Sequence, residues 1–150
     1  MNWTLKPFDQ LTLNELYGLL RLRCEVFIVE QVAYQDIDDL DQQAWHLFAQ
    51  DARGAVIACL RIFPKGVVYP DAAAIGRLCV SAAHRRRGLA SQMLDRALDY
   101  IDHTLTLPAT RISAQRYLQA FYESRGFIQS GEGYLEDGIP HIPMLRRGGC

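Results

Sequence analysis

The segment Ala74–Tyr100 has the sequence AIGRLCVSAAHRRRGLASQMLDRALDY. Its first part, residues 74–81, is mostly apolar and predicts a buried strand. Next come residues 82–87, which include three consecutive arginines and which we call the basic turn. Gly88 then opens a helix with apolar residues at helical spacing: Leu89, Met93, Leu94, Ala97, Leu98 and Ile101. The segment therefore predicts a strand, a tight turn and an amphipathic helix in succession.

The start of this helix is suited to a phosphate group. Free backbone N–H groups and a partial positive charge meet at a helix N-terminus. Gly88 has no Cβ and Ala90 is nearly as small, so a ligand can come close to the backbone. A solvated basic patch at a crossover would leave a similar pattern, but the strand–turn–helix context favours a pyrophosphate site. The P-loop pattern G-x-x-x-x-G-K-[ST] and the dinucleotide fingerprint G-x-G-x-x-G are both missing.

The pattern Arg85-x-x-Gly88-x-Ala90 after an apolar strand resembles the acetyl-CoA signature of the GNAT N-acetyltransferases. Ala90 stands where glycine is more common in that family. Three further blocks are similar to the bacterial ElaA-type branch of the family, at residues 22–31, 34–38 and 136–142. Together the blocks extend over most of the chain.

This resemblance implies a mixed α/β structure with the GNAT acyl-CoA N-acyltransferase fold, a mostly antiparallel sheet flanked by helices. It implies one domain, residues 1–150, that transfers an acetyl group from acetyl-CoA to a primary amine within a ternary complex. The acceptor would be a small cationic amine or a peptide amine. Homodimers are common in the family, and the sequence leaves the oligomeric state open.

The resemblance also assigns roles to residues. Backbone N–H groups from Arg86 to Ser91 would hold the pyrophosphate, and the N–H of Val80 would donate to the oxyanion. The hydroxyl of Tyr122 would protonate the departing thiolate. The full set expected to bind acetyl-CoA is Leu78, Cys79, Val80, Arg85, Arg86, Arg87, Gly88, Leu89, Ala90, Ser91, Gln115 and Tyr122.

The general base is less clearly marked. His141 is the best side-chain candidate because imidazole titrates in the right range; Glu136 and His46 follow, and a water chain is an equal alternative. Cys79 is expected to be a buried thiol and no nucleophile, since no activating base is visible near it.

Four carboxylates are candidates for attracting the acceptor: Asp36 and Asp38 in an acidic segment, with Glu136 and Asp137 before the last strand. A merely solvated acidic loop is the alternative explanation of the first two.

Other elements follow from local patterns. Thr12 and Glu15 form a capping box before a helix that would run to about Val29. The face expected to be buried carries Leu13, Leu16, Tyr17, Leu20, Cys24, Phe27 and Ile28. Strands are expected at 3–7, 45–51, 55–63, 111–114, 127–130 and 141–145, and a helix at 117–125.

Composition sets the outer limits. The chain has 150 residues, 49% of them hydrophobic, and a net charge of −1. That balance predicts a folded protein and gives no reason to expect nucleic acid or a membrane as partner. The spacing of the cysteines and histidines predicts no metal site, and reduced thiols in the cytoplasm are the default. The main functional alternative is a non-catalytic acyl-CoA-binding sensor or interaction domain on the same fold, and Tyr122 favours the enzyme.

Overall fold

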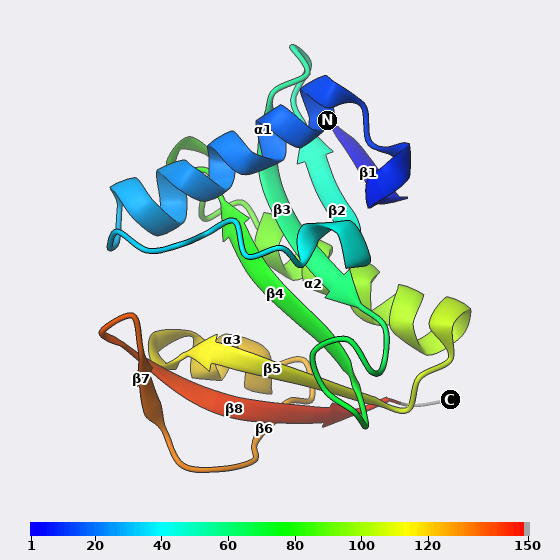
Figure 1. Cartoon of the computed structure of the whole chain (residues 1–150), viewed down its shortest axis with the longest axis vertical. Coiled ribbons are helices and arrows are strands. Elements are labelled where there is room, and N and C mark those ends of the chain that lie inside the picture. The colour runs from blue at the N-terminus through cyan, green and yellow to red at the C-terminus, as the bar shows by residue number, and fades with distance from the viewer. Residues whose placement is uncertain (149–150) are drawn as a thin grey trace.

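The computed structural model describes residues 1–148, in which eight strands form a single sheet (Figure 1). Its strand order is β1-β2-β3-β4-β5-β8-β6, and β7 also pairs with β8. The strands are β1 Asn2–Pro7, β2 Trp45–Gln50, β3 Val56–Phe63, β4 Ala73–Val80, β5 Ala109–Gln115, β6 Ile128–Gln129, β7 Tyr134–Glu136 and β8 Ile139–Arg147. All pairings are antiparallel except that of β4 with β5, so the mixed, mostly antiparallel sheet expected from the sequence is confirmed.

Three α-helices cover the sheet: α1 Leu13–Arg23, α2 Leu89–Tyr100 and α3 Gln119–Glu123. Figure 1 shows α1 in front of β2, β3 and β4, and α2 behind them. Wider π-helical turns continue α1 over Cys24–Val29 and α2 over Ile101–Leu105. Short 3-10 turns lie at Phe8–Gln10, Asp41–Gln43, Ala82–His84 and Arg116–Leu118. No helix in the described part of the chain is long and apolar enough to cross a membrane.

The strand–turn–helix segment is confirmed. All six residues of the predicted apolar face of α2 are buried in the main core. Gly88 forms the N-cap in the left-handed region, with φ 76°. The capping box of Thr12 with Glu15 is also present. The strand β7 was not predicted, because it is three residues long and lies in a glycine-rich segment.

The predicted buried face of α1 was wrong. Leu13 and Tyr17 are 85% and 74% exposed, whereas the buried residues of the helix are Leu19, Leu22 and Arg23. Gly18 explains the rotation, since an added Cβ would lie 2.8 Å from a Val56 methyl group. The helix therefore packs closely on β3 through its glycine, and its buried stripe continues with a charged residue.

The sheet is split along its middle. β4 meets β5 only at Ala73–Thr110 and Ala74–Arg111, after which the two strands diverge. β5, in contrast, pairs with β8 from Ala109 to Gln115. Figure 1 shows the resulting gap between the layer of β1 to β4 and the layer of β5 to β8.

A β-bulge interrupts β4 just beyond the point of divergence. Cys59 opposes Cys79, but Arg61 opposes Gly76, so that Arg77 and Leu78 together face a single residue of β3. Arg77 has a φ of 52°. A left-handed conformation costs a non-glycine residue roughly 1–2 kcal/mol, so other contacts must hold Arg77 in place.

The irregular segment between α1 and β2 is fixed by buried ion pairs. Three arginines from α1, β3 and β4 bind three aspartates of this segment; we call these six residues the arginine–aspartate network, and they are Arg23, Arg61, Arg77, Asp36, Asp38 and Asp41. The side chains of Arg23 and Asp36 are 2% and 5% exposed. His46 on β2 donates from Nε2 to the Asp41 carbonyl at 2.8 Å, and burial lowers its pKa. His46 is thus a structural histidine that ties β2 to the same segment.

Because of the network, the free energy of unfolding is expected to vary with pH in the acidic range. Burial alone would raise the pKa of Asp38, but hydrogen bonds and positive charge from Arg61 outweigh it and lower that pKa to about 2. A depressed carboxylate pKa stabilises the fold above the unfolded value of about 3.9, and this contribution is lost as the pH falls toward 2. We expect Asp38→Asn to be less stable than the wild type at pH 7 by about 1–2 kcal/mol and to lose less stability between pH 5 and pH 2.5. Urea unfolding across this range measures both; parallel curves for the two proteins would contradict the assignment.

Candidate functional site

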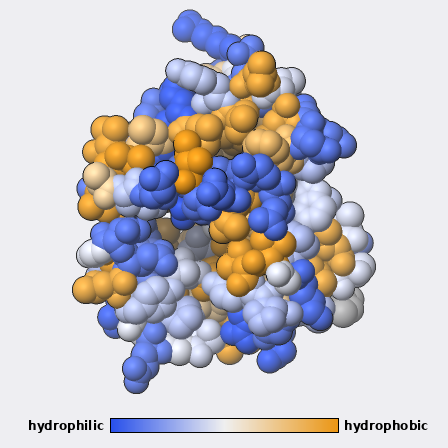
Figure 2. All heavy atoms as spheres, in the orientation of Figure 1, coloured by the Kyte–Doolittle hydropathy of each residue, from blue (hydrophilic) through white to orange (hydrophobic). Residues whose placement is uncertain are grey.

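The gap between β4 and β5 leaves backbone groups of β4 available to a ligand. Ser81 donates its N–H to Ile57 on β3, and in the same register Val80 opposes Ala58. N–H directions alternate along an antiparallel ladder, so the N–H of Val80 points away from β3, toward the gap. Figure 2 shows a hollow in the surface between the two layers on this face. A ligand seated there can pair with β4 as an added strand would.

The basic turn lies directly after the open end of β4. Within the described chain, none of the backbone N–H groups from Arg86 to Ser91 donates to a protein acceptor. A Cβ added at Gly88 would meet no atom within 4 Å, so the space above this residue is open. Open space and unpaired donors at a helix N-terminus fit a diphosphate group.

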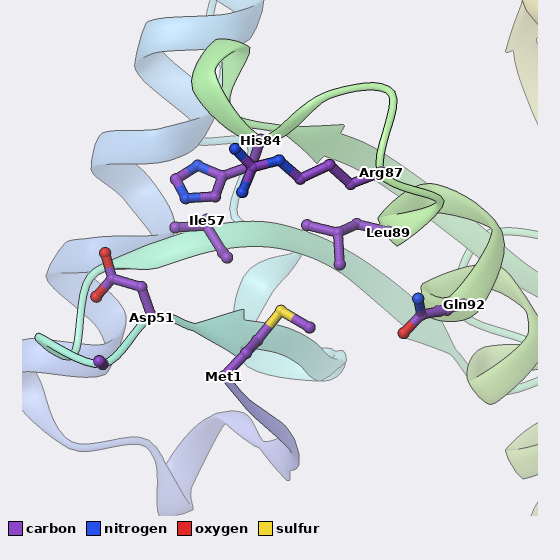
Figure 3. A pocket seen from close by; sticks show the side chains of 8 residues that line it. Met1, Asp51, Ile57, His84, Arg87, Leu89 and Gln92 are labelled. Carbon is purple, nitrogen blue, oxygen red and sulfur yellow. The ribbon is translucent and has the colours of Figure 1, made fainter.

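The arginines of the turn have different surroundings. Arg85 donates from Nε to the Val80 carbonyl at 3.0 Å and binds Glu30 at 2.9 Å, so its guanidinium braces the end of β4. Arg87 extends beside His84, as Figure 3 shows, over a cavity of about 380 Å³. Asp51, Ile57 and Gln92 also line this cavity, on the β3 side of the turn. The side chains of Arg85 and Arg87 are thus directed to Glu30 and to this cavity, respectively.

Tyr122 on α3 is buried among aromatic rings. Its ring packs edge-on against Phe121 and Phe127, with centroids 5.2 and 5.7 Å away. Burial raises the pKa of its hydroxyl well above the ordinary value of 10, with a smaller contribution from Tyr117. Tyr122 makes no hydrogen bond through its hydroxyl to any residue from 1 to 148. The side chain thus offers a hydroxyl that is protonated at neutral pH and is free to donate.

A second group of side chains lies on the β7–β8 hairpin. The Nδ1–H of His141 donates to the Ile139 carbonyl at 2.7 Å. In the neutral ring Nε2 is therefore the nitrogen that carries the lone pair. The carboxylate of Glu136 lies 3.4 Å from Nε2. Tyr134 stacks on His141 with centroids 6.1 Å apart and hydrogen-bonds Ser113 on β5. The histidine is therefore fixed in orientation and tautomer, with a carboxylate beside its free nitrogen.

Gln115 joins this hairpin to the segment after α1. It opposes His141 across the β5–β8 ladder and donates from Nε2 to the Gln31 side chain at 3.0 Å. This contact spans the gap near the tip of β5. The sequence indicated Gln115 and His141, and Gln31 lies in the family-like block 22–31 without an assigned role, but Ser113 and Tyr134 were not singled out. Their relevance follows only from strand pairings that bring distant segments together.

Asp36 and Asp38 have no free carboxylate oxygen. Asp36 accepts from Arg23, Arg77 and Tyr34, and Asp38 from Arg61, Arg77 and the N–H of Leu40. The acidic segment is thus neither a solvated loop nor an unpaired acidic rim. Asp137 lies at the exposed tip of the β7–β8 hairpin, with φ 52°. Of the four predicted acceptor carboxylates, only Glu136 stands beside another candidate residue.

Cys79 is buried and its Sγ lies 3.6 Å from that of Cys59. Their shared hydrogen bond and burial raise the pKa of the Cys79 thiol, which disfavours the reactive thiolate. Cys150 lies outside the described residues. Among the described side chains, histidines, cysteines and carboxylates form no group that is arranged to hold a metal ion.

Comparison with known proteins agrees with this geometry. Residues 13–147 match the acetyltransferase (GNAT) domain family. The chain is 38% identical to protein ElaA of Escherichia coli over 97% of this chain and 96% of that protein. It is 34% identical to a UPF0039 protein of Schizosaccharomyces pombe, over 96% and 95%. Relatives are therefore not confined to bacteria.

Two crystal structures are also similar. The structure of Escherichia coli ElaA has a TM-score of 0.90 and 37% identity, over 97% of this chain and 99% of that chain. An acyl-CoA N-acyltransferase from Pseudomonas aeruginosa has a TM-score of 0.89 and 43% identity, with the same coverage. Sequence, fold and the open edge of β4 beside an unpaired helix N-terminus lead to one conclusion: the chain belongs to the GNAT acetyltransferase family and is of the ElaA type.

Proposed function

We propose that this protein is an acetyl-CoA-dependent N-acetyltransferase that acts on a primary amine. The observation that carries the proposal is the open edge of β4, which ends at the unpaired N–H groups of the basic turn. Pantetheine amides would pair with the edge at Leu78 and Val80, and the pyrophosphate would bind the N–H groups from Arg86 to Ser91. Gly88 and Ala90 leave room for it. The relative from Pseudomonas aeruginosa, described as an acyl-CoA N-acyltransferase, supports this assignment.

The residues around the gap supply the groups that acetyl transfer needs. The amine nitrogen attacks the thioester carbonyl, whose oxygen becomes negative and accepts from the N–H of Val80. The carbon–sulfur bond then breaks, and the hydroxyl of Tyr122 donates to the thiolate as it leaves. One such backbone donor lowers the barrier by about 3 kcal/mol in acyl-transfer enzymes. The products are the amide and free CoA thiol.

The amine must lose a proton before it attacks. We assign that proton to Nε2 of His141, the nitrogen left basic because Nδ1–H is held by a backbone carbonyl. The carboxylate of Glu136 stabilises the imidazolium that forms. A water chain can deliver the proton to Nε2 if the amine does not reach it directly.

The acceptor we favour is a small cationic amine. With Asp36 and Asp38 neutralised by arginines, Glu136 is the free carboxylate beside the proposed base. The ring of Tyr134, stacked on His141, offers a face to a cation. A variant of the spermidine N-acetyltransferase SpeG from Vibrio cholerae shares the fold at a TM-score of 0.69 and 18% identity, which is consistent with room for such a substrate on this fold.

Acetyl-CoA should stabilise the protein through the basic turn. At 100 times its dissociation constant a ligand adds about 2.7 kcal/mol to the free energy of unfolding, whereas ATP and NAD should add much less. We expect Gly88→Glu to abolish the shift in melting temperature, because its side chain fills the open space with negative charge. Gly66→Glu is the matched control, since Gly66 also has a positive φ, 97°, and open space but lies between β3 and β4. An unshifted wild type would overturn the proposed function itself.

Tyr122→Phe should lower turnover far more than it weakens acetyl-CoA binding. The hydroxyl is assigned to the leaving thiolate, so its loss should reduce kcat by roughly 10²-fold or more, within the usual range for acid catalysis. Tyr117→Phe, which alters an exposed tyrosine of the adjoining turn, should leave kcat unchanged. The assay is release of free CoA thiol under conditions where chemistry limits the rate. Normal turnover in Tyr122→Phe would make Tyr122 a packing residue, and a wild type that binds acetyl-CoA without turning over any amine would favour the sensor alternative.

Glu136→Gln should reduce kcat/KM for polyamines and lysine-type amines by about two- to fivefold at low salt, the range expected for one exposed charge pair. The reduction should shrink above physiological ionic strength, because exposed charges are screened beyond about 8 Å. Glu132→Gln removes an equally exposed carboxylate from the preceding segment and should have no effect. An acceptor screen that finds only neutral or acidic acceptors would contradict this assignment while leaving acetyl transfer intact.

A further inference from the structure

We propose that Arg77 and Asp36 are positioning residues, which fix the β4 bulge and thereby decide that the N–H of Val80 is the one left free in the gap. The inference rests on the proposed role of this N–H as oxyanion donor. It gives the acidic segment a function that is neither acceptor binding nor solvation.

The bulge controls which amide of β4 is unpaired. Before it, Arg61 opposes Gly76; after it, Ala58 opposes Val80. If the first register continued without the extra residue, Val80 would oppose Ile57, and its N–H would take the place on β3 that Ser81 now occupies. The bulge therefore shifts the free amide by one residue along the strand.

Arg77 is an unexpected residue for the position it occupies. Bulges of this kind usually place glycine where the backbone is left-handed, because glycine adopts a positive φ without strain. Arg77 has a φ of 52°. We infer that the side-chain contacts of Arg77 with Asp36 and Asp38 stabilise this conformation.

The anchor of Arg77 is the segment after α1. Its Nε donates to Asp36 Oδ1 at 3.0 Å, and its Nη2 donates to both the Asp36 carbonyl at 3.2 Å and Asp38 Oδ2 at 3.3 Å. The guanidinium also lies 5.2 Å from the centroid of the Tyr34 ring. These contacts fix the guanidinium from several directions at once.

Asp36 cannot move freely in response, because α1 holds it independently. Its other oxygen accepts from Arg23 Nε at 3.0 Å, and Arg23 also binds the Asp36 carbonyl. Both side chains are almost completely buried. A chain of hydrogen bonds thus connects the bulge through Arg77 and Asp36 to Arg23, a buried residue of α1.

Substitutions at Arg77 separate the side-chain anchor from the backbone conformation. Arg77→Ala removes the anchor and keeps the strain of a positive φ, whereas Arg77→Gly removes the anchor and relieves the strain. We expect kcat to fall at least tenfold in Arg77→Ala, short of the 10²–10³-fold loss of a complete oxyanion donor, and to recover severalfold in Arg77→Gly. Most of the shift in melting temperature caused by acetyl-CoA should remain in both, because the basic turn proposed to hold the pyrophosphate is untouched and only the pairing of pantetheine with Leu78 and Val80 is affected.

A matched control comes from Arg111 and Asp71, which form an exposed pair with similar two-point geometry near the start of the gap. Arg111→Ala should leave kcat unchanged. Asp36→Asn tests the anchor from its other end. If it unfolds because the buried Arg23 loses a partner, the variants of Arg77, whose side chain is 21% exposed, still decide the matter.

The outcomes are distinct. Folded Arg77→Ala with normal kcat, or Arg77→Gly no better than Arg77→Ala, overturns the inference. The inference is supported if kcat decreases in the order wild type, Arg77→Gly, Arg77→Ala while acetyl-CoA affinity changes little. A general loss of stability would lower the affinity as well. A wild type that neither binds acetyl-CoA nor releases thiol instead overturns the proposed function.

Discussion

β4 is hydrogen-bonded along its length to β3 but meets β5 only at Ala73 and Ala74. Backbone polar groups that lack partners are costly inside a fold and promote unwanted pairing at an edge, so such an opening in the middle of a sheet needs an occupant. Residues 1–148 supply none. The basic turn, which begins where the free edge ends, also has unpaired donors. One extended ligand with amides at one end and a diphosphate at the other would satisfy both, as proposed here for acetyl-CoA.

Holding such a gap open requires a rigid frame, and the arginine–aspartate network provides it. Buried ion pairs add little net stability, because desolvation offsets much of their attraction, but removing one partner is strongly destabilising. Their contribution here is geometric. The three arginines come from α1, β3 and β4, and the aspartates from one irregular segment, so the ion pairs fix the orientation of these elements in addition to the apolar cluster that joins them. Aliphatic side chains would bury area there but would not fix the orientation of a strand bulge.

Short sequence patterns correctly predicted the elements that depend on contacts between residues close together in the chain. The apolar stripe of α2, the capping box of Thr12 and the glycine before α2 each depend on residues within a few positions of one another, and each was found as expected. The face of α1 was mispredicted because its orientation is set by the contact of Gly18 with Val56 on another element. A hydrophobic periodicity cannot anticipate a buried arginine.

The same distinction applies to the site. The proposed phosphate site at the start of α2 is one continuous stretch and could be inferred from the sequence, and Tyr122 could be inferred through the family resemblance; both assignments stay predictions. The ion pairs of Asp36 could not be predicted from the sequence, because its partners Arg23 and Arg77 lie 13 and 41 residues away along the chain. A run of aspartates looks the same whether it faces solvent, a cation or three arginines. The one local hint was an arginine within an otherwise apolar strand.

The neutralised acidic segment also changes where specificity can reside. Acetyl-CoA would be bound mainly by backbone groups, which are insensitive to side-chain identity, and the frame around them is locked by buried ion pairs. The β7–β8 hairpin is different: Tyr134 and Glu136 are exposed, and they contact His141 and Ser113 rather than any residue of the network. Acceptor choice can therefore change through this hairpin while the geometry of acetyl transfer is preserved. In the proposed arrangement the charges of the molecule would act in two separate ways, those of the network on the backbone of β4 and that of Glu136 on the incoming amine.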